Sequence, residues 1–296
     1  MRLSVVTALF NGLDYTRAYL DSLLESLEDV IDFEIIFVDD GSSDSTREWL
    51  QSLDLSVPTK IFFNDANLGY GRSNNFGASK AEGDVLAFLN NDILLQSGWF
   101  EPMLEALKRP HRWMGHERMP GLVGNVQWRV SDPVLDHAGI YFDIYSAPQH
   151  RDFGEKQLRR KGSEAVVGAT AACWVTEREW FTRLGGFDER FVNGMEDVDF
   201  CLQTLEWGRV PVVSFDSQIK HHVSASRVGG AQDEKNFLEL FRKWRYVLNE
   251  IAFITAENEM QSGVRRVFRK GSGPNRKLQS FINHSAKLVL KPPSSH

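Results

Sequence analysis

The sequence predicts an open, mainly parallel α/β sheet with helices on its faces. Two observations carry this prediction. Short β-branched apolar runs recur over residues 3–89, and segments with apolar residues at helical spacing lie between them. The connections are short and polar, as in units where a helix links two parallel strands. Ligands of such sheets bind outside the carboxyl ends of the strands, so we expect the functional site there.

The regular part of the pattern ends near residue 107. The expected strands share a nearly unbroken apolar character, which indicates burial on both faces. They cover residues 3–8, 33–38, 59–63 and 85–89. The expected helices cover residues 15–27, 74–81 and 98–107, and a further one opens at Ser45. Ser45 and Glu48 have the spacing of a capping box at that helix start.

From residue 121 the pattern is less regular. A strand is expected over 122–126, followed by a stretch rich in loops, and a second strand over 210–215. Helices are expected over 177–184, 197–207 and 237–253, the last being long and amphipathic.

The composition is that of a globular protein. Of the 296 residues, 42% are hydrophobic and 25% are charged, which excludes the disordered and fibrous classes. No apolar run reaches the roughly 18 residues that a membrane-spanning helix needs. Cys173 and Cys201 are too few for a disulfide framework or a structural zinc site. The first apolar run is too short for a signal peptide, so we expect a cytoplasmic protein.

The net charge of −6 conceals two oppositely charged parts. Residues 1–259 hold all 40 acidic residues but only 26 of the 34 basic ones. This acidic body argues against nucleic acid as a partner, because phosphate contacts need a basic surface. The basic segment 263–291 has apolar residues near helical spacing. It is either a solvated tail or an amphipathic segment that makes peripheral contact with a membrane.

Polar clusters follow two of the buried strands. VDDGS, which contains Asp40, is typical of a turn, and its carboxylates are also suited to accept a hydrogen bond from a nucleobase N–H. FLNND ends in Asn90, Asn91 and Asp92. These oxygens either cap a helix or bind Mg²⁺ or Mn²⁺ that is held mainly through substrate phosphates.

A second acidic cluster and a histidine pair lie in the later part of the chain. GMEDVDF places Glu196 and Asp197 at a helix start, where the helix dipole favours acids. A carboxylate near a metal-bound phosphate is also the natural general base for a sugar hydroxyl. His221 and His222 follow a strand-like run and are either metal ligands or polar residues at a strand end.

The glycine-rich segment 67–77 is not a dinucleotide-binding fingerprint. Asn74 stands where the third glycine is needed, and the segment does not open the first helix. The sequence also lacks a Walker phosphate loop and a G-x-S-x-G nucleophile elbow, so a dehydrogenase or serine hydrolase is not expected.

Taken in order, these segments resemble the inverting family 2 glycosyltransferases of the GT-A fold. The resemblance covers residues 3–226 and is nearest to bacterial rhamnosyl- and galactofuranosyl-like transferases that build surface polysaccharides. The motifs that carry it are TALFNG, VDDGS, ANLGYGRSNNFG, GDVLAFLNND, VGATAACWVTEREWFTRLGGFDERF, GMEDVDFCLQTLEWG and IKHHVSAS. The resemblance implies a donor-binding half over 1–125, an acceptor-binding and catalytic half over 126–234, and a C-terminal helix with a basic tail over 235–296.

The resemblance also implies a role for each matching residue. Asp197, with Glu196 beside it, is the expected catalytic base, and Asp92 and His221 are the expected ligands of Mn²⁺ or Mg²⁺, with His222 as the alternative. Asn90 stands where the family often has Asp, which leaves one firm carboxylate ligand. The expected donor-binding residues are Thr7, Asn11, Asp40, Asn67, Gly69, Asn75, Asn90 and Asn91. The expected cleft residues are Gly168, Ala169 and Trp174.

The function implied by the resemblance is transfer of a sugar, with inversion, from a UDP- or dTDP-linked donor to a glycan or lipid-linked acceptor. A nucleotidyltransferase is the second enzyme class with this architecture. It usually has a glycine-rich, basic loop after the first strand, and this sequence has none there. The third possibility is a non-catalytic protein that binds nucleotide sugars, for which Asn90 would be a sign. The joint presence of Asp92, Asp197 and His221 argues against it.

Overall fold

The computed structural model describes residues 1–27, 31–132, 134–143, 146–151, 158–222 and 231–262. The chain divides into two compact units, Met1–Ala252 and Phe253–His296. The description below concerns the first unit, since in the second only the helical backbone of residues 253–262 is described. The basic segment 263–291, for which we considered membrane contact, lies outside the described residues.

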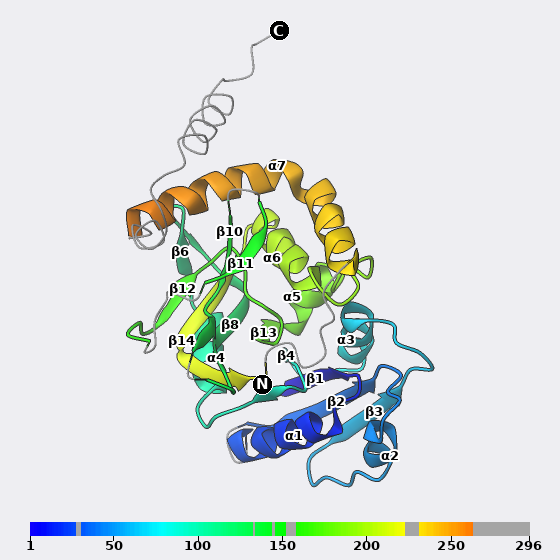
Figure 1. Cartoon of the computed structure of the whole chain (residues 1–296). Helices are drawn as coiled ribbons and strands as arrows, with labels where there is room; N and C mark the ends of the chain where they lie inside the picture. The colour runs from blue at the N-terminus through cyan, green and yellow to red at the C-terminus, as the bar shows by residue number, and fades with distance from the viewer. Residues whose placement is uncertain (28–30, 133, 144–145, 152–157, 223–230, 263–296) are drawn as a thin grey trace. The chain divides into compact units, whose positions relative to one another are not determined.

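A mixed, mostly parallel sheet forms the centre of the first unit (Figure 1). The parallel part contains β1, β2, β3 and β4, which pair in the order β4-β1-β2-β3. Their bounds are Leu3–Leu9, Phe33–Asp39, Thr59–Phe63 and Val85–Leu89. The four predicted strands are therefore confirmed, two of them to the residue. β1, β2 and β4 are buried because apolar side chains point to both faces, whereas β3, at the edge of the sheet, is only partly buried.

The rest of the sheet continues from β4 in the order β12-β14-β8-β13-β4. β13 is antiparallel to β4 and β8, whereas β14 is parallel to β8. The bounds are Pro120–Arg129 for β8, Ser163–Ala165 for β12, Cys173–Glu177 for β13 and Val210–His221 for β14. β8 contains residue 125, so one sheet spans the expected boundary between the two halves.

Two short strands pair with this sheet, and four others form separate hairpins. β5 (Ile93–Leu94) pairs with the end of β14, and β9 (Leu135–His137) pairs with β8. Two separate hairpins are formed by β6 (His111–Trp113) with β7 (His116–Arg118), and by β10 (Ile140–Phe142) with β11 (Pro148–His150).

Helices cover both faces of the sheet (Figure 1). One face packs against α1 (Leu13–Leu27), α2 (Thr46–Gln51) and α4 (Phe100–Leu107). The other packs against α3 (Tyr70–Ser79), α5 (Arg178–Arg183) and α6 (Glu196–Glu206). This arrangement confirms the predicted α/β class. It also leaves the carboxyl ends of the parallel strands beside the starts of α3 and α6.

α7 (Ala231–Ser262) is longer than the helix predicted over 237–253. Within the first unit, Leu240, Trp244 and Leu248 on α7 pack against Val198 and Leu202 of α6. None of the helices in the described residues is long and apolar enough to cross a membrane.

Three predicted details are wrong. α3 begins at Tyr70 rather than near 74, because Gly69, at φ 92°, turns the chain directly into the helix. β14 continues to His221 rather than ending near 215, with an irregular register between Ser214 and Gln218. The capping box is not formed: the Thr46 N–H at the start of α2 donates to Asp44 Oδ1 (3.0 Å), and Ser45 makes no side-chain cap.

Candidate active site

The candidate metal ligands meet where β5 pairs with the end of β14. In this ladder His221 pairs with Ile93, the residue that follows Asp92 in the sequence. The pairing places His221 Nε2 3.2 Å from Asp92 Oδ1, and both side chains are largely buried. Asn90, at the end of β4, donates its backbone N–H to the Ala172 carbonyl (2.9 Å). The FLNND motif thus lies against the segment that precedes β13.

The structure separates the two adjacent histidines. His222 donates its backbone N–H to the Asp92 carbonyl (2.9 Å), and its ring packs against Tyr15 with centroids 4.8 Å apart. The imidazole of His221, not that of His222, faces the Asp92 carboxylate.

Asp136 lies on the far side of His221, and the sequence analysis did not identify it. Its Oδ2 is 4.0 Å from His221 Nδ1, and its Oδ1 accepts a hydrogen bond from Arg129 Nε (3.2 Å). The neighbouring His137 is fully buried. This burial is the largest cause that holds the pKa of His137 well below its usual range. The only signal in the sequence is an Asp-His pair between apolar residues in VLDHAGIYF.

The pair formed by Asp92 and His221 fits a divalent cation. Asp92 Oδ1 is buried and makes no hydrogen bond within the described part of the chain, and His221 Nε2 faces it at 3.2 Å. A carboxylate oxygen and an imidazole nitrogen are both ligands of Mn²⁺-type cations. No third His, Cys, Asp or Glu joins them in a metal-binding group among the described residues. The remaining coordination positions would therefore be left to substrate oxygens and water.

Asp197 is the second residue of α6 and lies beside the segment 168–172. Its Oδ1 accepts the Val198 N–H (2.8 Å), and its Oδ2 accepts the Ala171 N–H (3.2 Å). The residues Asn193 (φ 54°) and Met195 (φ 74°) adopt left-handed backbone conformations immediately before α6. Such conformations are costly for non-glycine residues and cluster at functional sites. Here they form the sharp turn that leads into the acidic helix start.

Glu196 is more buried than Asp197, with 6% of its surface exposed. Its Oε2 accepts the Gly194 N–H (2.7 Å), so the carboxylate holds the turn before α6. Of the two adjacent acids, the half-buried Asp197 is therefore the one placed to reach a substrate.

Backbone hydrogen bonds hold the segment 168–172 in place. The Gly168 carbonyl accepts the Ile140 N–H (2.7 Å), and the Thr170 N–H donates to His137 Nε2 (3.3 Å). Gly168 and Ala169 are buried, and a Cβ on Gly168 would lie 3.3 Å from the Cβ of Cys201. Trp174 is fully buried in the core behind this segment, where its ring stacks on Phe187 (5.6 Å between centroids, 9° between planes).

Two of the expected donor-binding residues have their polar groups engaged inside the protein. Thr7 is fully buried, and its hydroxyl shares a 2.7 Å hydrogen bond with the Tyr19 hydroxyl. Asp40 accepts the N–H groups of Leu68 (2.8 Å) and Gly69 (2.9 Å), together with the Ser73 hydroxyl (2.8 Å). Asp40 thus fixes the glycine-rich loop that leads into α3.

Asn11 and Asn91 link the ends of β1 and β4. Asn11 Oδ1 accepts the Ser43 N–H (2.7 Å), and Asn91 Nδ2 donates to the Thr16 hydroxyl (2.9 Å) and to the Asn11 carbonyl (3.3 Å). Asn67, by contrast, is exposed next to this edge.

Asn75 has different partners from those we expected. Its amide donates to the Phe187 carbonyl (2.8 Å) and accepts the Phe187 N–H (2.8 Å). Both halves of the amide therefore hold the turn after α5.

The hydroxyl of Tyr70, the first residue of α3, donates to the Ala171 carbonyl (2.9 Å), next to the contact of Ala171 with Asp197. Burial is the largest cause that raises the pKa of Tyr70 well above its usual value, and the carboxylates of Glu196, Asp197 and Asp92 raise it further. Tyr70 was not a predicted site residue, because its position depends on where α3 starts.

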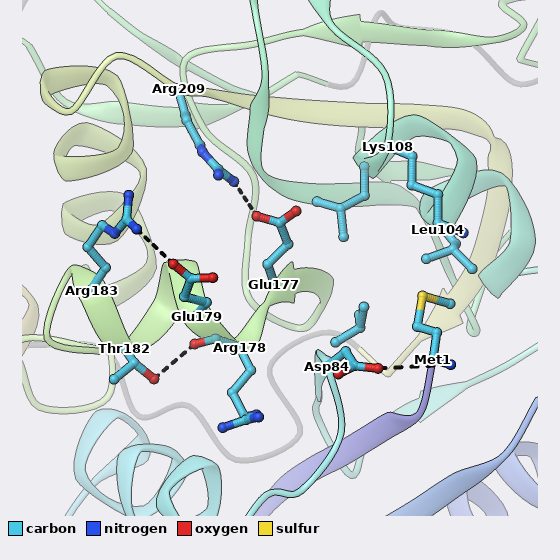
Figure 2. A pocket seen from close by; sticks show the side chains of 12 residues that line it. Met1, Asp84, Leu104, Lys108, Glu177, Arg178, Glu179, Thr182, Arg183 and Arg209 are labelled. Atoms are coloured by element: carbon cyan, nitrogen blue, oxygen red, sulfur yellow. Dashed lines mark hydrogen bonds and ion pairs between the residues drawn. The ribbon is translucent and has the colours of Figure 1, made fainter.

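A cavity of about 820 Å³ lies at the opposite, amino edge of the sheet (Figure 2). Ion pairs line it, including Arg209 with Glu177 (2.5 Å) and Arg183 with Glu179 (2.7 Å). None of the predicted site residues lines this cavity.

Comparison with known proteins agrees with this arrangement. The family model described as "Glycosyl transferase family 2" matches residues 4–185. The O-antigen biosynthesis protein RfbC of Myxococcus xanthus is 28% identical over 261 residues, which is 82% of this chain and 19% of that protein. The uncharacterized protein y4gI of Sinorhizobium fredii is 28% identical over 77% of this chain and 26% of its own length. The chain thus spans about a quarter or less of these two relatives.

Solved structures share the fold at low sequence identity. GalNAc-T7, crystallised with UDP, GalNAc and Mn²⁺, superposes with a TM-score of 0.64 at 17% identity, over 81% of this chain and 47% of that one. The mannosyltransferase PcManGT of Pyrobaculum calidifontis, in complex with GDP-Man and Mn²⁺, superposes with a TM-score of 0.57 at 17% identity. The superposition covers 98% of this chain and 81% of that one. The family match and the shared architecture establish that the chain belongs to the family 2 glycosyltransferases and has the GT-A fold.

Proposed function

We propose that the chain transfers a sugar from a nucleoside diphosphate donor to a hydroxyl group of a glycan or lipid-linked acceptor, with inversion at the anomeric carbon. One observation carries the proposal. Asn90, two residues before Asp92, and Asp197 are hydrogen-bonded to the adjacent residues Ala172 and Ala171, so the pair formed by Asp92 and His221 and the Asp197 carboxylate flank the same segment at the carboxyl edge of the sheet. A general base and a site for the leaving group are what one displacement step requires.

Asp197 has the geometry of a general base. Two backbone N–H groups orient its carboxylate, and its half-buried position leaves it accessible to a substrate. It accepts the proton of the acceptor hydroxyl while that oxygen forms a bond to the anomeric carbon. The bond from that carbon to the diphosphate oxygen breaks, and the leaving group keeps the electron pair. A single displacement inverts the anomeric centre.

Asp92 and His221 would hold Mn²⁺ or Mg²⁺, which neutralises negative charge on a bound diphosphate. Among the described residues, Asp92 and Asp197 have no Lys or Arg partner. The charge of these two carboxylates is therefore not neutralised by a basic side chain, and a cation held there would offset the charge of an anionic donor. The Mn²⁺ bound in GalNAc-T7 and PcManGT, which have the same fold, supports this assignment.

The acceptor class is the least defined part of the proposal. The relative from Myxococcus xanthus is named for O-antigen biosynthesis, which supports a polysaccharide or its lipid-linked precursor as acceptor. GalNAc-T7 was crystallised with UDP and PcManGT with GDP-Man, so the test below includes donors with both bases.

Release of nucleoside diphosphate tests the proposal directly. The full chain is incubated with UDP-glucose, UDP-N-acetylglucosamine, dTDP-rhamnose or GDP-mannose, with Mn²⁺ or with EDTA. We expect Mn²⁺-dependent release from at least one donor. Tight binding of a donor with no release from any would favour the non-catalytic alternative.

We further propose that the enzyme works at the cytoplasmic face of a membrane, where lipid-linked acceptors are present. Support comes from the basic and apolar composition of residues 263–291. Co-sedimentation of the full chain with anionic vesicles at low salt tests this. In the comparison variant, Gln replaces each of four basic residues: Arg265, Arg266, Arg269 and Lys270. Equal sedimentation of both proteins would refute the role of the segment.

A further inference from the structure

One residue of the segment 168–172 joins Tyr70 to the general base. The Tyr70 hydroxyl donates to the Ala171 carbonyl (2.9 Å), 101 positions later in the sequence. The N–H of the same Ala171 donates to Asp197 Oδ2 (3.2 Å). Two hydrogen bonds therefore link the phenol to the carboxylate through a single backbone residue.

Tyr70 is itself firmly held. Its N–H donates to Asn193 Oδ1 (2.9 Å), and its ring meets Phe187 edge to face, with centroids 5.7 Å apart. Asn193 belongs to the turn that leads into α6. The start of α3 is thus tied both to the segment 168–172 and to the turn that carries Asp197.

The segment 168–172, which Tyr70 contacts, has few side chains that could form hydrogen bonds. Four of its five residues are Gly or Ala, so their side chains make no hydrogen bonds. Its position depends on hydrogen bonds from its backbone to groups elsewhere in the chain. These groups belong to Ile140, His137, Asn90, Tyr70, Asp197 and Cys201, whose Sγ donates to the Ala169 carbonyl (3.7 Å). Of these, the hydroxyl of Tyr70 is the side-chain donor to the Ala171 peptide.

We propose that Tyr70 is a positioning residue for proton transfer: its hydroxyl fixes Ala171 and, through the Ala171 N–H, the orientation of the Asp197 carboxylate. The inference rests on the proposed role of Asp197 as general base. Asp197 Oδ1 is already oriented by the adjacent Val198 N–H, whereas Oδ2 depends on Ala171 for its internal partner. Because burial and the surrounding carboxylates raise the pKa of Tyr70, its hydroxyl remains a donor at neutral pH.

Tyr70→Phe is the test variant, because it removes one oxygen and keeps the ring. Thr176→Val is the matched control. It removes a buried hydroxyl that donates to a backbone carbonyl, that of Gly121 (2.6 Å), near the other end of β13. Both variants lose one buried hydrogen bond to the backbone, so a general loss of stability would affect them alike.

Amide hydrogen exchange provides the readout that needs no substrate. Exchange in peptides that cover residues 168–172 should be about five- to tenfold faster in Tyr70→Phe than in the wild type. In Thr176→Val it should be unchanged. Equal protection of this segment in Tyr70→Phe and the wild type, or equal acceleration in both variants, would overturn the inference.

The kinetic arm uses Mn²⁺-dependent release of nucleoside diphosphate from the donor panel. Tyr70→Phe should lower kcat about tenfold with the donor KM unchanged, and it should have no further effect in an Asp197→Asn background. An equal additional loss in that background would overturn the inference, since the base would then not mediate the effect. Full activity of Asp197→Asn alone would instead refute the proposed function, and hydrogen exchange would still decide whether Tyr70 fixes Ala171.

Discussion

The two edges of the central sheet both gather charged residues, but they pair them differently. At the amino edge, Arg209 contacts Glu177 and Arg183 contacts Glu179, so acids and bases neutralise one another around the cavity (Figure 2). At the carboxyl edge, Asp92 faces an imidazole and Asp197 accepts backbone N–H groups. In the described residues, neither of these two acids has a Lys or Arg partner.

The charges at the amino edge are paired within the protein, whereas the carboxylates at the carboxyl edge are available to bind a cation or a proton. Paired surface ions contribute little free energy and require nothing from outside the protein. Acids held together without basic partners repel one another unless a cation or proton joins them. The cavity at the amino edge is therefore the less informative of the two regions.

Asp197→Asn should produce the largest effect at the carboxyl edge. It removes the proton acceptor but keeps the side-chain shape, so sugar transfer, measured as release of nucleoside diphosphate, should fall by about 10²–10⁴-fold. Donor binding, followed by calorimetry, should persist. A rate near that of the wild type would exclude Asp197 as the base.

His221→Ala and His222→Ala sharpen the assignment of the metal ligand. The Nε2 of His221 faces Asp92, whereas the ring of His222 packs against Tyr15. His221→Ala should therefore weaken Mn²⁺ binding by about 100-fold, the upper end of the loss seen when a partner in a metal site is removed. His222→Ala should hardly change it. The measurement is the loss of the free Mn²⁺ signal in electron paramagnetic resonance with UDP present. The reverse ranking would place His222 at the metal.

Asp136→Asn should have a smaller effect on the same signal. Asp136 contacts His221 from the side opposite Asp92, and Arg129 holds its other oxygen. Loss of such an outer carboxylate costs about 10–100-fold in metal affinity, and we expect the lower end because Asn keeps one oxygen. Unchanged Mn²⁺ affinity would show that Asp136 does not orient His221.

Glu177→Gln should have the smallest effect, because it changes the amino edge. It breaks the ion pair with Arg209, but the Glu177 side chain is 41% exposed and solvent screens the interaction. The free energy of unfolding, from denaturant titration, should fall by less than about 1 kcal/mol. Nucleoside diphosphate release should be unaffected, and a substantial loss of it would contradict the contrast between the two edges.

The parallel core and the location of the site could be predicted from the sequence, because both depend on local patterns. Apolar runs define β1 to β4, and polar clusters such as FLNND end the strands at a shared edge. The end of β14 could not be predicted in this way. Its polar residues Asp216 to Gln218 interrupt the apolar pattern, whereas pairing with β8 and β5 carries the strand on to His221.

Contacts between distant segments were the second kind of information missing from the sequence. Tyr70 contacts Ala171, and Asp136 contacts His221, only because the folded sheet brings four separate segments to one edge. Thr7 and Asp40 show the reverse. Thr7 lies within β1 and Asp40 follows β2, and their polar atoms bond to Tyr19 and to the glycine-rich loop within the protein. Motif position alone does not reveal which polar groups are already engaged.

Donor binding by the wild type and by Asp92→Ala, each with Mn²⁺ and with EDTA, tests the central claim most directly. The claim is that the carboxyl edge binds the donor through a cation on Asp92. Calorimetry with UDP should show that Mn²⁺ strengthens binding to the wild type, and that Asp92→Ala loses this gain while its affinity in EDTA is nearly unchanged. Equal strengthening by Mn²⁺ in both proteins would contradict the account, since the cation would then be bound elsewhere.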